Sequence, residues 1–205
     1  MKNIDKIQNI LPLGYLFLVL LGIAKESIYY YQIGINIIKY SSIMDILISP
    51  IAAITSHPVF AIVIIILFTF FCNLPQLLFK YESSVWLHKN IGTDNKNPDF
   101  IQLPENERKE HYLTVSIKFF AFFLLSIFLG YGLADGNILS EKIKNNQLNY
   151  NYKLNYADET TENVFIIGSN TAYFFYVTKN SPIIKIAPTA SIKNIELTKN
   201  RMLSK

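Results

Sequence analysis

The chain has 205 residues, of which 51% are hydrophobic and 17% are charged, against ~25% charged residues in typical soluble domains. Its net charge of +4 comes from scattered lysines rather than a basic run, so we expect no nucleic-acid partner. The single cysteine, Cys72, can form neither an intramolecular disulfide nor a CxxC metal site.

The first predicted helix covers about residues 10–31 and is long and apolar enough to cross a membrane. Pro12 falls in its first turn, where proline is tolerated, and a cluster of tyrosines typical of the membrane interface marks its far end. We expect Lys25 and Glu26, near that end, to reach toward water. A second interpretation is a cleaved signal peptide, with Gly22-Ile23-Ala24 as the small-residue cleavage site.

Residues 32–57 contain Lys39, Asp45 and Pro50, and a charged side chain at the bilayer centre costs a few kcal/mol, so a full span is disfavoured. Apolar residues recur there at spacings of three and four, which predicts an amphipathic connector helix over about 33–48 and then a turn at Ser49-Pro50. Its apolar face either packs on the protein's own helices or lies in the membrane interface. A hidden fourth span in this segment is the alternative topology.

The second predicted span, about 58–79, is the stretch Val59–Phe79, which has no charged side chain. At ~1.5 Å rise per residue, such a helix covers the ~30 Å hydrocarbon core of a bilayer. Near its end stand Asn73, Pro75 and Gln76, the candidate intramembrane polar site. Polar groups at membrane depth usually face protein or a wet cavity, although these three could also simply mark the end of the helix.

A polar connection follows over residues 80–111, with loop residues at 90–98. Pro104 and the acidic residues after it predict a helix start, and this helix should run without a break into a third span over about 112–134. We expect Asp135-Gly136-Asn137 to end it.

Positive charge predicts the topology, because Lys and Arg mark cytoplasmic segments. The N-terminal tail and the loop 80–111 hold most of these residues near the spans: Lys2, Lys6, Lys80, Lys89, Lys96, Arg108 and Lys109. Both segments are therefore expected in the cytoplasm. Three spans then place the C-terminal domain outside the cell membrane, which in a Gram-negative cell means an inner-membrane protein with a periplasmic domain.

The C-terminal residues 137–205 read as a small β domain. Large apolar and polar side chains alternate from Leu148 to Tyr156, which predicts a half-buried strand. Turn residues separate four further predicted strands, which are Val164–Ile167, Tyr173–Val177, Ile183–Ala187 and Ile192–Leu197. About five antiparallel strands with short turns predict a barrel-like sheet. The expected fold is thus an α+β membrane protein, with a membrane domain over residues 1–136 and a β domain after it.

No catalytic, cofactor-binding or metal-binding residues are predicted. His57, His88 and His111 lack partners at metal-ligand spacing, and no GxSxG, P-loop or GxGxxG sequence occurs. We therefore expect a non-enzymatic accessory protein, with the lipid bilayer and a protein partner or further copies of itself as partners. A sensor subunit or an immunity or defence-type protein fits this description. The alternatives are a homo-oligomeric, channel-like assembly and a membrane enzyme using His88 or His111.

Overall fold

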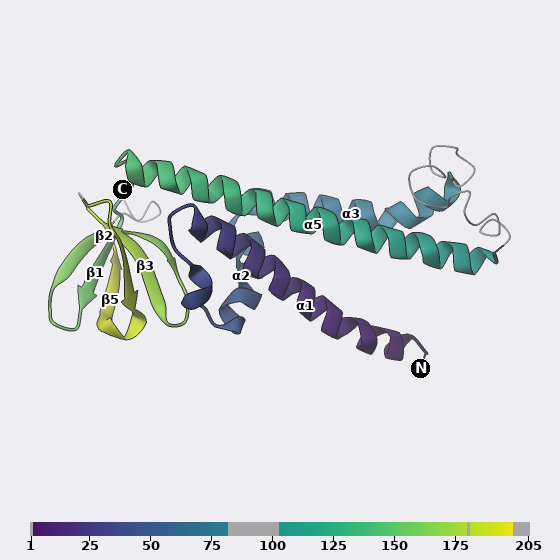
Figure 1. Cartoon of the computed structure of the whole chain (residues 1–205), viewed down its shortest axis with the longest axis horizontal. Coiled ribbons are helices and arrows are strands. Elements are labelled where there is room, and N and C mark those ends of the chain that lie inside the picture. The colour runs from purple at the N-terminus through teal and green to yellow at the C-terminus, as the bar shows by residue number, and fades with distance from the viewer. Residues whose placement is uncertain (1, 82–102, 180, 199–205) are drawn as a thin grey trace. The chain divides into compact units, whose positions relative to one another are not determined.

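The computed structural model describes residues 2–81, 103–179 and 181–198. Its helices are α1 (Lys2–Tyr31), the 3-10 helix η1 (Ile37–Lys39), α2 (Ile43–Ser56), α3 (Pro58–Lys80) and α5 (Glu105–Lys144) (Figure 1). Its strands are β1 (Tyr152–Tyr156), β2 (Thr161–Ser169), β3 (Tyr173–Thr178), β4 (Ile184–Pro188) and β5 (Ile192–Leu197), with the 3-10 helix η3 (Thr189–Ser191) before the last. The chain forms two compact units, one of residues 1–50 and 128–205 and one of residues 51–127.

Among the described residues, three helices are long and apolar enough to cross a membrane, as predicted: the segment Pro12–Tyr31 of α1, the whole of α3, and α5. Many of their large apolar side chains are exposed. Those on α3 are Val59, Ile62, Val63, Ile65, Ile66, Phe68, Phe70 and Leu77. A helix satisfies its backbone hydrogen bonds internally, so such a segment can present apolar side chains to lipid without unpaired backbone groups.

The first helix begins earlier than predicted, at Lys2, so Pro12 lies inside α1 rather than in its first turn. The expectation that Lys25 and Glu26 reach water is wrong, because their side chains are only 16% and 18% exposed. The Lys25 ammonium lies 2.7 Å from a Glu26 carboxylate oxygen, and the Ser49 hydroxyl of α2 donates to the same oxygen. Packing against α2 therefore replaces the expected hydration.

The connector helix forms later in the chain than the predicted residues 33–48. The chain instead turns after Tyr31, with Gly34 at φ +78°, and α2 begins only at Ile43. The reason is a capping box: the Asp45 amide donates to the Ser42 hydroxyl, and Asp45 in return accepts from the Ser42 amide. These bonds start a helix at Ile43.

The predicted turn at Ser49-Pro50 does not occur, because Pro50 lies inside α2. Proline has no N–H, which leaves the carbonyl of Ile46 without its helical donor. That carbonyl lies against Gly22 of α1, where a side chain would overlap it. Tertiary packing thus stabilises a helix that local sequence disfavours.

Helix α5 begins directly after Pro104 and runs unbroken through the predicted third span, as expected. The predicted stop at Asp135-Gly136-Asn137 is wrong, since α5 continues to Lys144. Gly136 serves close packing instead: a side chain there would overlap the Tyr29 carbonyl of α1, and one on Gly132 would overlap the Lys25 carbonyl. Small residues four apart let two helix backbones approach, which is common between membrane helices.

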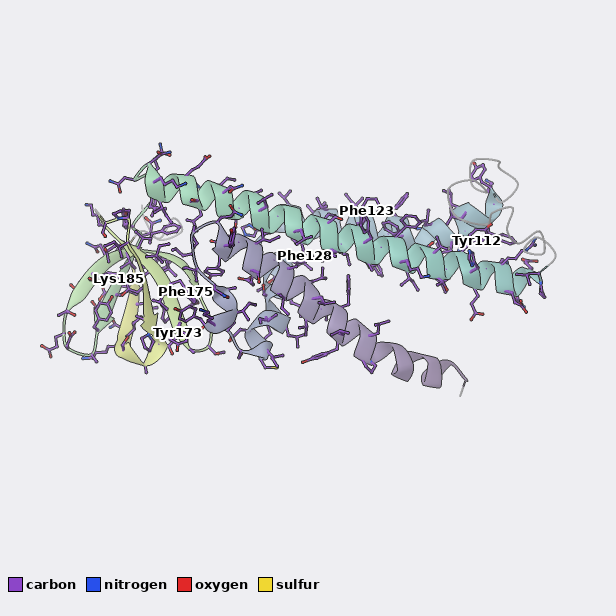
Figure 2. All side chains as sticks on the ribbon, viewed as in Figure 1. Tyr112, Phe123, Phe128, Tyr173, Phe175 and Lys185 are labelled. Carbon is purple, nitrogen blue, oxygen red and sulfur yellow. The ribbon has the colours of Figure 1, made fainter. Side chains whose placement is uncertain are left out.

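In the unit of residues 51–127, α3 and the first part of α5 pack antiparallel. Leu78 and Tyr112 form a buried core, and Phe71 lies with its ring centroid 5.6 Å from those of Phe120 and Phe123. Tyr112 and Phe123 are labelled in Figure 2. The cations of Arg108 and Lys109 lie over the ring of Phe79, so basic and aromatic residues gather at this end of both apolar segments.

The five predicted strands are present and form one antiparallel sheet with the order β4-β3-β2-β1-β5. The predicted barrel is wrong, because β4 and β5 lie at opposite edges and the sheet is not closed. Closure is not needed to bury the sheet, since helices cover one of its faces. Phe175 and Val177 of β3 are buried there against Tyr30 of α1 and Leu139 of α5.

The first strand is shorter than the alternation predicted. Only Tyr152–Tyr156 pairs as β1, where Leu154 is fully buried with Val164 and Tyr176 on the face away from the helices. Leu148 instead packs with Leu139 and Val177 on the helix side. The apolar residues that alternate from Leu148 to Tyr156 therefore belong to two different cores, one on each face of the sheet. Periodicity in the sequence does not show where one core ends and the other begins.

Candidate functional site

The predicted polar site lies on α3, which continues through Pro75 to Lys80. The side chains of Asn73 and Gln76 are exposed, and that of Pro75 is half-buried. The side-chain amide of Asn73 donates to the backbone carbonyl of Thr69 at 2.8 Å, one turn earlier in the same helix. A function for these residues stays a prediction.

The histidines are widely separated in sequence. His57 is the N-cap residue of α3, His111 lies on α5, and His88 falls outside the described residues. Within residues 2–81, 103–179 and 181–198, no three His, Cys, Asp or Glu side chains lie close enough together to hold a metal ion.

A polar network that the sequence did not reveal crosses four strands of the sheet. The hydroxyl of Tyr156 on β1 donates to Glu162 of β2 at 2.8 Å and lies 2.7 Å from the hydroxyl of Tyr176 on β3. The Lys185 ammonium of β4, labelled in Figure 2, donates to the other carboxylate oxygen of Glu162 at 2.5 Å. Each strand supplies one member, so the network stabilises the register of β1 to β4.

The environment of this network fixes its charge. Burial alone raises the pKa of the Glu162 carboxyl, but the hydrogen bonds from Lys185 and Tyr156 and the Lys185 charge lower it below its ordinary value. Burial, with the bonds to Tyr176 and Glu162, raises the pKa of the Tyr156 phenol. At neutral pH the Glu162 carboxylate is therefore ionised beside Lys185, and the Tyr156 phenol keeps its proton.

Strand β5 forms one edge of the sheet and, among the described residues, pairs only with β1. Beyond Ile192 every residue of β5 is exposed, including Ile195 at 39% and Leu197 at 48%. An edge strand presents unpaired backbone donors and acceptors, and natural proteins often protect such edges with charge or cover. Strand β5 carries the charged Lys193 and Glu196 as well as the apolar Ile195 and Leu197, and this apolar pair offers the contact for another extended segment.

The sheet is joined to the helices by an aromatic cluster. The ring of Phe175 lies 5.2 Å from Tyr30 at the end of α1 and 5.9 Å from Tyr40 after η1, and Tyr40 also lies 5.5 Å from Tyr173. Tyr173 and Phe175 both lie on β3 (Figure 2). A side chain on Gly168 would overlap the Tyr30 hydroxyl, so this glycine, beside a register shift in β2, makes room for the tyrosine.

Hydrogen bonds strengthen the same junction. Asp45 of α2 accepts from the amide and the hydroxyl of Thr171, both at 3.1 Å, and the Asn170 amide group donates to the Tyr40 carbonyl. Burial alone raises the pKa of Asp45, but the bonds from Ser42 and Thr171 lower it, which keeps the carboxylate ionised at neutral pH. The β2–β3 turn is thus fixed to the start of α2.

Comparison with protein-family models, with curated proteins and with solved structures found no match to this chain.

Proposed function

We propose that this chain is a non-enzymatic accessory protein of the cell membrane whose sheet binds a partner protein. Two classes of protein fit this description, a sensor subunit and an immunity protein against a membrane-directed toxin. The exposed edge of β5 is the observation that carries the proposal. The junction around Tyr30, Phe175 and Asp45 supports it, because a partner bound to the sheet would act on elements fixed to α1 and α2.

The proposed orientation places the N-terminus and the loop 80–111 in the cytoplasm and the sheet on the opposite, periplasmic or extracellular side. It rests on the lysines and arginines near the ends of the helices. An odd number of spans then separates the two termini. Three helices of sufficient length and apolarity support that number.

The proposed binding mode is strand addition. An extended segment of the partner would pair with the backbone of β5, and its side chains would pack beside Ile195 and Leu197. Backbone hydrogen bonds would supply affinity, and the apolar side chains on the edge would favour particular partner sequences.

A photo-crosslinking amino acid at Asn194 of β5 tests this mode in the full-length protein in its native membrane. We expect a discrete adduct with one protein, and loss of that adduct on adding Ile195→Lys and Leu197→Lys, because charge on an edge blocks strand pairing. The matched control is Ile183→Lys, an equally apolar exposed residue outside β5, which should leave the adduct intact. Adduct formation that survives both edge lysines would contradict the proposal.

A second candidate function is a homo-oligomeric, channel-like assembly, favoured by the exposed side chains of Asn73 and Gln76 on α3. Amide groups on an apolar span usually face protein or water rather than lipid. The mass of the purified protein in nanodiscs, measured with and without Asn73→Leu/Gln76→Leu, tests it. An oligomer that dissociates in the double variant supports the assembly, whereas a monomer for the unmodified protein removes it.

A further inference from the structure

Helix α2 has two distinct faces. One face is buried and includes Ile46, Ser49 and Ala53, with Ile46 only 6% exposed. The other carries large apolar side chains that are all more than half exposed, namely Ile43, Met44, Ile48 and Ile51. Met44, Ile48 and Ile51 follow at spacings of four and three along one side of the helix, with Ile43 next to Met44 in the first turn.

The buried face of α2 packs where the surroundings of α1 change. Before this point α1 exposes apolar side chains, including Leu13, Leu16 and Leu20. From Leu21 to Tyr30 the residues of α1 are buried or half-buried: Gly22 lies against Ile46, Glu26 pairs with Ser49, and Tyr30 packs into the sheet. Helix α2 therefore packs on α1 at the point where its exposed apolar side chains give way to covered ones.

The polar groups around α2 and its length fit a helix that lies along a membrane surface rather than across the membrane. The charged pair Lys25–Glu26 lies at the α1–α2 contact, and Asp45 in the first turn of α2 bonds to Thr171 of the sheet. No Asp, Glu, Lys or Arg stands between Asp45 and Lys80. With 14 residues, α2 is ~21 Å long, which is too short to cross the ~30 Å hydrocarbon core.

We infer that α2 is an interfacial helix, and that its face of Ile43, Met44, Ile48 and Ile51 is immersed at the boundary of headgroups and acyl chains in the leaflet nearest the sheet. The occupant of this face is lipid, because α2 packs on α1 at Gly22, between the exposed apolar residues Leu13, Leu16 and Leu20 and the Lys25–Glu26 pair. Helices of this kind bury their apolar side ~5–10 Å into the interface. The inference rests on the membrane placement proposed above.

The test uses the full-length chain with Cys72→Ser, reconstituted in phosphatidylcholine vesicles and labelled with an environment-sensitive fluorophore at single cysteines. The positions are Ile48→Cys on α2, Ile66→Cys on α3 and Ile183→Cys beside β4, all exposed. Nitroxide lipids labelled near the headgroup or deep in the acyl chain serve as quenchers, with iodide as the aqueous quencher.

At Ile48→Cys we expect a blue-shifted emission that the shallow nitroxide quenches more than the deep one. At Ile66→Cys the deep nitroxide should be the stronger quencher, and at Ile183→Cys only iodide should act. Quenching of Ile48→Cys by iodide alone, by the deep nitroxide best, or by none of the three would overturn the interfacial placement. If Ile66→Cys also escapes both nitroxides, the membrane placement itself is wrong, which separates the two failures.

Discussion

The carbonyl oxygen of Ile46 lies in the space that a side chain on Gly22 would occupy. Pro50 frees this carbonyl from helical hydrogen bonding, and Gly22 lets the two backbones meet. The α1–α2 contact thus depends on one residue that lacks an N–H and another that lacks a side chain.

Replacing Gly22 tests this contact. Gly22→Ala should destabilise the protein by about 1–3 kcal/mol, because the added methyl group meets backbone atoms that cannot rotate away. Gly14→Ala in the same helix meets nothing within 4 Å and should be neutral or stabilise by about 0.5–1 kcal/mol. Thermal unfolding in one detergent measures both, and equal melting temperatures would show that α2 does not pack here.

Gly168 and Tyr30 should be energetically coupled. Gly168→Ala should lower stability because its methyl group meets the Tyr30 hydroxyl, and Tyr30→Phe should recover most of the loss by removing that oxygen. Side chains in contact commonly show coupling energies of about 0.5–3 kcal/mol in double-mutant cycles. Additive effects of the two changes would mean that α1 does not end against this strand.

The Glu162 network gives the sheet a pH dependence. The folded-state pKa of Glu162 lies below its ordinary value of 4.5, so its stabilisation is full above that value and is lost as pH falls through the folded pKa. Glu162→Gln should cost about 1 kcal/mol at neutral pH, since the carboxylate is partly exposed and solvent screens its ion pair.

The difference in melting temperature between the unmodified protein and Glu162→Gln should shrink as pH falls from about 6 to 3. Glu196→Gln is the matched control, because the ion pair of Glu196 with Lys153 is longer, at 3.9 Å, and the Glu196 side chain is more exposed than that of Glu162. A difference for Glu162→Gln that stays constant over this range would contradict the assigned network.

The elements predicted best from sequence are those fixed by local composition. The uncharged stretch Val59–Phe79 became α3, and the apolar runs around Val164, Phe175 and Ile184 became strands. The start of α5 after Pro104 was also predicted correctly, because the proline and the acidic residues that favour a helix start lie within one helical turn.

The errors fall where distant residues override local preference. Pro50 and Gly136 look like helix breakers, yet the backbones of Ile46 and Gly136 pack against α1 and the helices continue. The polar network was missed because Glu162 and Lys185 meet only once β2, β3 and β4 have paired. A charged residue on the apolar side of a strand is the sequence feature that points to such a network. It identifies no partner until the pairing register of the strands is known.

A pair of reporters fused after Lys205 tests whether the sheet lies outside the cytoplasm, as proposed above. We expect alkaline phosphatase to be active in this fusion and a cytoplasmic fluorescent reporter in the same place to be dark. An inactive phosphatase together with a bright fluorescent reporter, at equal expression, would place the sheet in the cytoplasm and contradict the three-span topology.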